Sequence, residues 1–150
     1  LRLLDEVRLV QRSVRCIVAA EFQLRVFTAR ITGFGGVFFR SPDPTAVAAW
    51  YSDKLSLTVA DWVGAALQND GDGPPHTAWS PFQADTDYFK PHRGEFMINF
   101  AVDELNGFLA SLERKGVEIL GRQEMEGMGS FAWIVDPDGT KIEFWQPEKS

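Results

Sequence analysis

The segment from Ile31 to Pro147 contains the same pattern twice. The closing stretches of its two halves align without a gap, DGPPHTAWSP (72–81) against DGTKIEFWQP (138–147), with Asp, Gly, Trp and Pro at matching offsets. A duplication constrains the fold more than any single motif, because each copy is a supersecondary unit that must pack against its neighbour. One strongly curved sheet alone would leave its concave face unfilled.

Each half has the order β-α-β-β-β. In the first half we expect a strand at 31–40, a helix capped by Thr45 and ending near Leu55, and strands at 57–64, 65–68 and 76–82. The second half repeats this with a strand at 95–102, a helix after Asp103 and three further strands. Its helix carries an amphipathic stripe of Leu105, Phe108, Leu109 and Leu112. The predicted fold class is α+β, with two βαβββ modules in tandem that form curved mixed sheets with the helices on the outer face.

The domain prediction has four parts. Module one is 31–82, module two is 95–147, and residues 83–94 are a linker. Asp85, Asp87 and Tyr88 in this linker are interpreted as a lid, as a contact with a neighbouring subunit or as part of an ordinary solvated loop, and we favour the loop. Residues 1–30 differ in composition, with six arginines, no lysine and no glycine or proline. This stretch is interpreted as a docking helix, a targeting peptide or an extension that the domain does not need, and we favour the extension.

Composition excludes several function classes. The net charge of −6 argues against nucleic acid, which is bound by Lys and Arg that neutralise phosphates, and is unfavourable at an anionic membrane surface. A single cysteine, Cys16, excludes an internal disulfide and a cysteine-based zinc site. No apolar run reaches the roughly 18 residues that a transmembrane helix needs. We therefore expect a soluble, cytoplasmic domain.

Two stretches resemble the vicinal oxygen chelate superfamily, which includes glyoxalase I, bleomycin-resistance proteins and extradiol dioxygenases. GVFFRSPDPTAVAAWYSDKLSL resembles the family's opening strand, turn and helix, and FAWIVDPDGTKIEFWQP resembles its closing hairpin. The resemblance covers residues 31–147. It implies a homodimer, and in metal-using members it implies a divalent cation that chelates adjacent substrate oxygens as a Lewis acid.

The resemblance places the four metal-ligand positions of the family on Gly36, Thr77, Met97 and Glu143. Glycine has no donor, a thioether is too soft for Mg, Mn or Fe, and a threonine hydroxyl is a weak ligand. We therefore expect no metal cofactor, with a divalent metal as the disfavoured alternative. Alternation places His76 on the strand face opposite Thr77, and His92 lies in the linker. Both histidines are interpreted as exposed or turn residues, although a His76–Glu143 metal pair stays open.

Strand alternation also predicts the lining of the concave cavity. The ligand-binding residues in phase with the family positions are Phe38, Arg40, Trp79, Met97, Asn99, Lys141 and Trp145. The opposite phase is apolar and suits packing under the helices. Aromatic and cationic groups together favour a flat, partly apolar organic ligand with an acid group. Alternatively, the tryptophans fill the core or an interface, and Arg40 and Lys141 lie at a solvated mouth.

Glu143 is the candidate catalytic residue. It is a residual metal ligand, a buried carboxylate that moves a proton or binds a ligand, or a structural residue paired with Lys141 or Arg40. Function has three interpretations. We favour a metal-free protein that sequesters or transforms a small organic compound; a metal-dependent lyase, isomerase or dioxygenase with rearranged ligands and a non-catalytic interaction domain are the alternatives. The sequence leaves open whether the protein is an enzyme.

Overall fold

The computed structural model describes residues 29–149, which form seven strands and two helices. In chain order these are β1 (Ile31–Ser41), α2 (Pro44–Leu55), β2 (Ala65–Gln68), β3 (His76–Gln83), β4 (Phe96–Val102), α3 (Leu105–Arg114), β5 (Gly121–Met125), β6 (Gly129–Val135) and β7 (Lys141–Pro147). The extension predicted at residues 1–30 lies almost entirely outside the described residues. Only its last part is described, where the Arg30 amide donates a hydrogen bond to Asp103.

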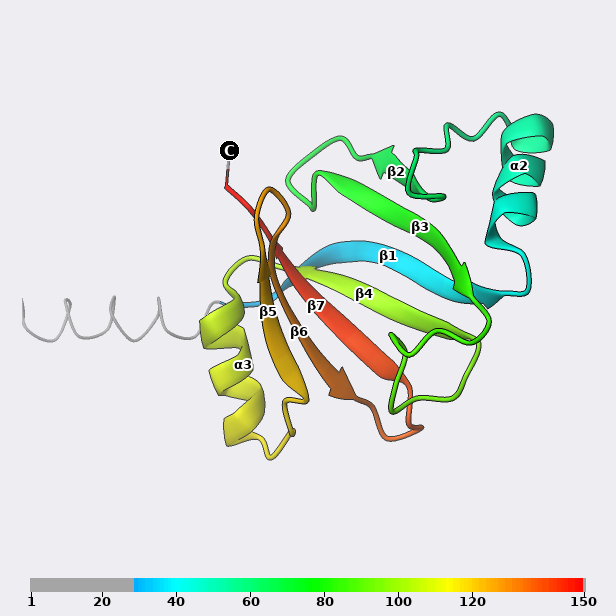
Figure 1. Ribbon diagram of the computed structural model, residues 1–150. Coiled ribbons are helices and arrows are strands. Elements are labelled where there is room, and N and C mark those ends of the chain that lie inside the picture. The colour runs from blue at the N-terminus through cyan, green and yellow to red at the C-terminus, as the bar shows by residue number, and fades with distance from the viewer. Residues whose placement is uncertain (1–28, 150) are drawn as a thin grey trace, which may run out of the picture.

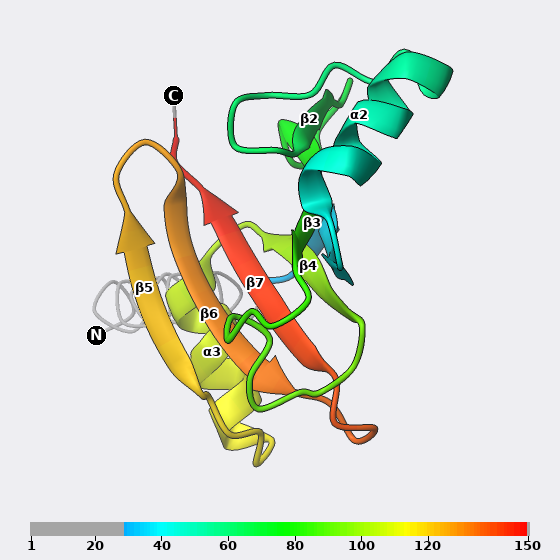
Figure 2. The same ribbon diagram turned by 45° about the vertical axis from the view of Figure 1, so that its right-hand side comes forward.

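The seven strands form one mixed sheet in the order β2-β3-β1-β4-β7-β6-β5. Strands β1 and β4 pair antiparallel at its centre and join the modules, while β1–β3 and β4–β7 are parallel pairs. The sheet curves, with α3 behind β5, β6 and β7 and α2 beside β3 at the other end (Figures 1 and 2). This confirms the predicted α+β fold of tandem modules with the helices outside.

Module one has one strand fewer than predicted. Residues 57–64 form no strand, because Ala60 donates to the carbonyl of Gly64 and Val63 donates back to the carbonyl of Ala60, which closes a tight turn. Val63 adopts a left-handed φ of 64° in this turn, a conformation that does not extend a strand. Only 65–68 therefore pairs with β3, and module one is β-α-β-β within the described part of the chain.

Module two contains the main hydrophobic core. Helix α3 begins after Glu104, whose carboxylate accepts hydrogen bonds from the amides of Asn106 and Gly107, so Glu104 rather than Asp103 is the cap. Leu105 and Leu109 are buried, and Phe108 and Leu112 pack against the same cluster. The predicted stripe is thus confirmed. Burial of a leucine as complete as that of Leu109 stabilises the fold by about 2 to 3 kcal/mol.

The pleat of module two follows the predicted alternation. The residues that pack under α3 include Ile98, Phe100, Ile142 and Phe144. Their neighbours in the sequence, Asn99 and Glu143, consequently lie on the opposite, concave face. The apolar side chains of β4 and β7 pack against α3. The polar side chains of these strands are therefore left on the concave face, where they form a site.

Candidate functional site

One row of side chains runs across the concave face through all seven strands. In strand order its members are Ala66, Ala78, Gly36, Asn99, Glu143, Trp133 and Gly121. The row is made of small residues in module one, whereas in module two it contains Asn99, Glu143 and Trp133 before it ends on Gly121. Glu143 lies between Asn99 and Trp133, and the site is therefore built mainly by module two.

Glu143 is almost completely buried, at 1% exposure, and its carboxylate accepts three hydrogen bonds. Oε1 accepts from the Asn99 amide at 2.6 Å, while Oε2 accepts from the Tyr88 hydroxyl at 2.5 Å and from the Trp133 indole at 2.6 Å. Bonds to a charged acceptor are shorter and stronger than neutral ones. The carboxylate therefore orients three side chains that come from the linker, β4 and β6.

Burial shifts the ionisation of the groups around this carboxylate. Desolvation raises the pKa of Glu143, although the hydrogen bonds from Tyr88, Asn99 and Trp133 and the charge of Lys141 oppose the rise. Desolvation, and then the charge of Glu143, raise the pKa of the Tyr88 phenol. Desolvation lowers the pKa of Lys141 against the opposing effect of Glu143. Tyr88 thus remains a protonated donor at neutral pH and is no base.

The linker folds back over the concave face instead of extending into solvent. Arg40 on β1 holds it at both ends, since its guanidinium donates to the carbonyls of Ala84, Thr86 and Gly94. Lys141 Nζ donates to the Tyr88 carbonyl at 2.6 Å. Figures 1 and 2 show the segment between β3 and β4 crossing in front of the sheet. The expectation of a solvated loop is wrong for its middle, because Tyr88 is half-buried and Phe89 is fully buried.

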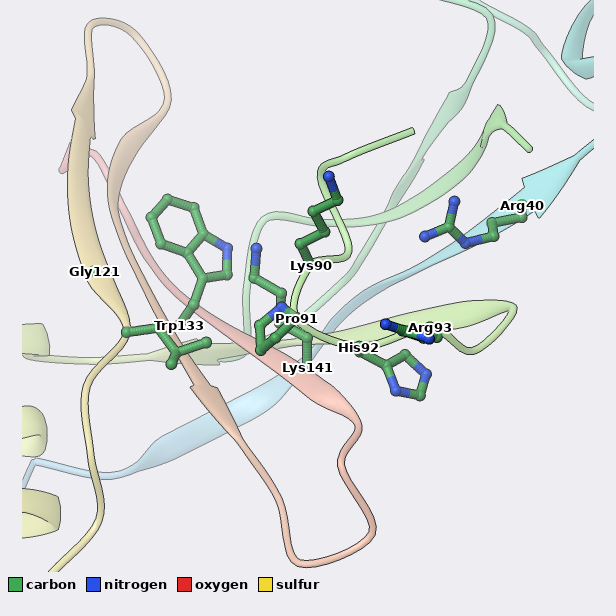
Figure 3. Close-up of a pocket in the computed structure, with 9 residues that line it drawn as sticks. Arg40, Lys90, Pro91, His92, Arg93, Gly121, Trp133 and Lys141 are labelled. Atoms are coloured by element: carbon green, nitrogen blue, oxygen red, sulfur yellow. The ribbon is translucent and has the colours of Figure 1, made fainter. Parts of the chain in front are cut away.

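A pocket of about 840 Å³ opens beside the buried carboxylate. Its lining residues are Arg40, Lys90, Pro91, His92, Arg93, Leu120, Gly121, Trp133 and Lys141. Figure 3 shows Trp133 and Gly121 at one end, Arg40 at the other, and the remaining cations between them. Lys141 Nζ lies 5.2 Å from the centre of the Trp133 ring, a cation–π distance. We call this cavity the basic pocket.

The structure brings some of the sequence-predicted residues together. Arg40 and Lys141 line the basic pocket, while Glu143, Asn99 and Met97 are buried on the same face. Phe38 also lies on the concave face, in register with Met97, but its ring packs against Phe82 outside the lining. His92, interpreted from sequence as an exposed or turn residue, is half-buried and lines the pocket.

The face predicted for strand β3 is wrong. Trp79 is in register with Val37, and its ring packs 4.5 Å from that of Tyr51 on α2, so it faces the helix. Thr77 lies two residues before Trp79 on the same strand, so its side chain points to the same, helix-facing side. His76 is therefore on the concave face, where its ring lies 4.9 Å from that of Trp145. The concave position of Trp145 fits the prediction, but its ring packs with Ala101 and Phe131 and does not line the basic pocket.

The gapless alignment of the closing stretches caused this error. Phe38 lies two residues after Gly36, and Asn99 lies two residues after Met97, so Phe38 and Asn99 hold equivalent positions in the two modules. Phe38 is in register with Ser80, and Asn99 is in register with Glu143. Ser80, three residues after Thr77, is thus the structural counterpart of Glu143. The shared Asp, Gly, Trp and Pro letters do not preserve the register of the sheet.

Sequence reasoning missed Trp133, and it did not place Tyr88 beside Glu143. Trp133 could have been predicted. The turn at 136–139 joins the two strands of an antiparallel hairpin, and pairing of Val135 with Lys141 places Trp133 opposite Glu143. Tyr88 carried no comparable signal, since it is distant in sequence and lies in an irregular segment. Lys90 and Arg93 lie in the same irregular segment and were missed for the same reason, and Leu120 and Gly121, around the start of β5, were also missed.

The side chains do not fit the metal that the superfamily resemblance implies. With Ser80 in place of Thr77, the four positions hold a glycine, a serine, a methionine and Glu143, and the oxygens of Glu143 already accept three hydrogen bonds. No group of three His, Cys, Asp or Glu side chains within residues 29–149 is arranged to hold a metal ion. A hydroxyl and a thioether would contribute little to coordination of a hard cation.

Tandem modules joined through their first strands, with a concave site on the closing strand, define a class of small α+β proteins. The chain belongs to the Glyoxalase/Bleomycin resistance protein/Dioxygenase superfamily, whose family model matches residues 33–144. No curated protein matches this chain in sequence. Within the described residues, neither helix has the length and apolar character needed to cross a bilayer.

Several solved structures share the fold at low sequence identity. A variant of Streptomyces coelicolor methylmalonyl-CoA epimerase in complex with 2-nitronate-propionyl-CoA is 15% identical, with a TM-score of 0.60, and the match covers 80% of this chain and all of that one. The Mycobacterium tuberculosis methylmalonyl-CoA epimerase is 16% identical, with a TM-score of 0.57 over 81% and 92% of the two chains. A Legionella pneumophila structure described as an NAD-dependent benzaldehyde dehydrogenase is 14% identical, with a TM-score of 0.52 over 75% and 98%. These likenesses support the fold.

Proposed function

We propose that this protein binds a small organic molecule in the basic pocket and that it does so without a metal ion. The observation that carries the proposal is the pocket itself, which lies on the concave face next to the Glu143 cluster and is bordered by Trp133 and Lys141. Its volume of about 840 Å³ lies within the range of sites for small organic ligands and cofactors. An aromatic wall with a few convergent polar groups is the usual composition of such sites.

The buried cluster prepares this pocket for a ligand. Glu143 fixes the indole of Trp133 through Nε1, and Lys141 is held by the carbonyl of Tyr88. Both groups are thus oriented before a ligand enters, which reduces the entropy lost on binding. In this proposal Glu143 is a positioning residue. It does not line the pocket, and its oxygens are engaged by three donors.

The proposal of metal independence rests on the donor set. Gly36, Ser80 and Met97 supply no strong oxygen or nitrogen ligand. Glu143 would have to exchange hydrogen bonds from Tyr88 and Trp133 for a bond to the metal. Binding would leave those donors without partners in a buried place, at a cost of about 1 to 3 kcal/mol each.

A ligand screen read by tryptophan fluorescence tests the binding function. The titrated compounds are flat organic molecules, and they include acyl-CoA esters because two of the similar folds are methylmalonyl-CoA epimerases. A saturable change that is lost in Trp133→Phe supports the proposal. Trp79→Phe is the matched control, since Trp79 faces α2 and this variant should retain the response. A response lost only in Trp79→Phe would place the ligand elsewhere.

Metal analysis of the purified protein tests the second part. We expect less than stoichiometric metal, and we expect ligand binding to survive treatment with chelator. Stoichiometric Ni, Zn, Mn or Fe that is lost in Glu143→Ala would instead establish the metal-dependent alternative. Absence of binding by every compound, with a correctly folded protein, would favour the interaction domain.

A further inference from the structure

The proposed binding function leaves the ligand class open, and the charge of the basic pocket narrows it. We propose that the ligand is an amphipathic anion, with a carboxylate or phosphate at the end that Arg40 borders and a flat apolar body against Trp133 and Leu120. This inference rests on the proposed function and names the class of molecule that the same site accepts.

The first argument is an excess of positive charge in an acidic protein. Four cationic side chains, Arg40, Lys90, Arg93 and Lys141, line the pocket, and the lining contains no Asp or Glu. The whole chain has a net charge of −6, so this concentration of cations runs against its composition. Clefts lined by one sign of charge raise the local concentration of ligands of the opposite sign.

The second argument is that the protein's own carboxylates leave the charges of Arg40 and Arg93 uncompensated, whereas Lys141 interacts with the charge of Glu143. The guanidinium of Arg40 donates to three backbone carbonyls, which fix its position without cancelling its charge. Arg93 forms no ion pair with any described residue. Lys90 pairs with Asp87 at 2.7 Å, but both side chains are more than two-thirds exposed, so that pair is weak and exchanges readily.

The third argument is the polarity of the pocket along its length. Trp133 and Gly121 lie at the end opposite Arg40, and the other cations lie between the two ends (Figure 3). Leu120 precedes Gly121 and adds apolar surface at the Trp133 end. Gly121 contributes no side chain there, which leaves space over the indole. A molecule with charge at one end and a flat apolar body at the other matches this arrangement.

Binding measured by calorimetry with three probes of one shape tests the inference. The probes are 2-naphthoate, 2-naphthyl phosphate and uncharged 2-naphthamide. We expect at least one anion to bind about tenfold more tightly than the amide, which corresponds to about 1.4 kcal/mol, and its affinity to fall as salt is added. A tighter carboxylate and a tighter phosphate both support the inference and identify the head group.

Three variants locate the interaction. The double variant Lys90→Glu with Arg93→Glu should weaken anion binding by about tenfold or more and leave amide binding unchanged. Lys54→Glu together with Arg122→Glu makes the same change of charge at exposed positions outside the pocket and should leave both affinities unchanged. Gly121→Leu keeps every charge but fills the apolar end, where a Cβ has ordinary contact with Trp133 at 3.8 Å, and should weaken all three probes.

The outcomes separate this inference from the proposed function. If the amide binds as tightly as both anions and Gly121→Leu weakens all three, the pocket binds ligands by shape and the anion inference is wrong. If no probe binds and the acyl-CoA and wider fluorescence screens are also negative, the proposed function itself fails. Equal loss of anion binding in the pocket and control variants would show a general effect of protein charge and would also overturn the inference.

Discussion

The hydroxyl of Tyr88 donates to Oε2 of Glu143 at 2.5 Å across 55 positions of sequence. This bond joins the linker between the modules to the last strand of the sheet. The phenol of Tyr88 occupies the position beside Oε2 in which a molecule bound to Glu143 would have to lie. The carboxylate of Glu143 is therefore closed to a ligand, and it positions side chains of the neighbouring pocket instead.

Replacement of Tyr88 by phenylalanine should destabilise the fold. The ring can keep its stacking with Phe82, but Glu143 loses one donor in a place that water does not reach. We expect a loss of about 1 to 3 kcal/mol in the free energy of unfolding, measured by urea denaturation. Tyr51→Phe is the matched control, because Tyr51 packs on Trp79 and its hydroxyl makes no hydrogen bond to another described residue. Equal losses in both variants would contradict the role of the bond.

Glu143 should make stability fall as pH rises. Burial raises the pKa of Glu143 in the folded state above its ordinary value of 4.5. Between these two values the folded protein binds more protons than the unfolded chain, so the free energy of unfolding decreases with increasing pH. The contribution is fully present below the ordinary value and is lost as pH rises through the folded pKa.

The comparison with Glu143→Gln isolates this effect from the other carboxylates. The variant has no charge to bury, and its stability relative to the wild type should therefore increase as pH rises through that window. Urea denaturation at a series of pH values gives the difference directly. Parallel stability curves for the two proteins would show that the folded pKa of Glu143 is not raised.

Replacement of Arg40 by lysine should loosen the linker. A lysine keeps the charge but cannot reach the carbonyls of Ala84, Thr86 and Gly94 together with one rigid planar group. We expect faster cleavage within residues 83–94 under limited proteolysis, followed by mass spectrometry of the fragments. Arg122→Lys serves as the control, since Arg122 forms an exposed ion pair with Glu113 on the other module. Unchanged cleavage in Arg40→Lys would show that Tyr88 and Phe89 hold the linker without Arg40.

Gly35→Ala should disturb the Glu143 cluster from the neighbouring strand. A Cβ at position 35 would overlap the side-chain oxygen of Asn99, whose amide is 2.6 Å from Glu143. Forced movement of a packed, hydrogen-bonded side chain costs about 1 to 3 kcal/mol. Gly73→Ala is the control, because its nearest neighbour, the Thr32 carbonyl oxygen, is 3.8 Å away. A loss of stability confined to Gly73→Ala would refute this account.

The parts of the fold that depend on local pattern could be predicted from sequence. The stripe from Leu105 to Leu112 predicts the face of α3, and the apolar phase of β4 and β7 predicts the side that packs beneath it. The inward direction of Glu143 follows from that alternation, because a strand with one face under a helix has only one other face. Trp79 shows the limit: repeated letters predicted its position, but pairing with β1 set the register of β3 and turned the ring toward Tyr51.

The sequence by itself determined the two modules, the apolar and polar faces of the strands in module two, and the position of the Glu143 carboxylate on the concave side. These follow from periodicity, which acts over a few residues. Only the tertiary structure decided that Tyr88 and Trp133 would saturate that carboxylate and that Arg40, Arg93 and Lys141 would share a pocket. Those contacts join segments tens of residues apart through an irregular linker. Their geometry depends on how the linker packs against the sheet, and no local pattern encodes that packing.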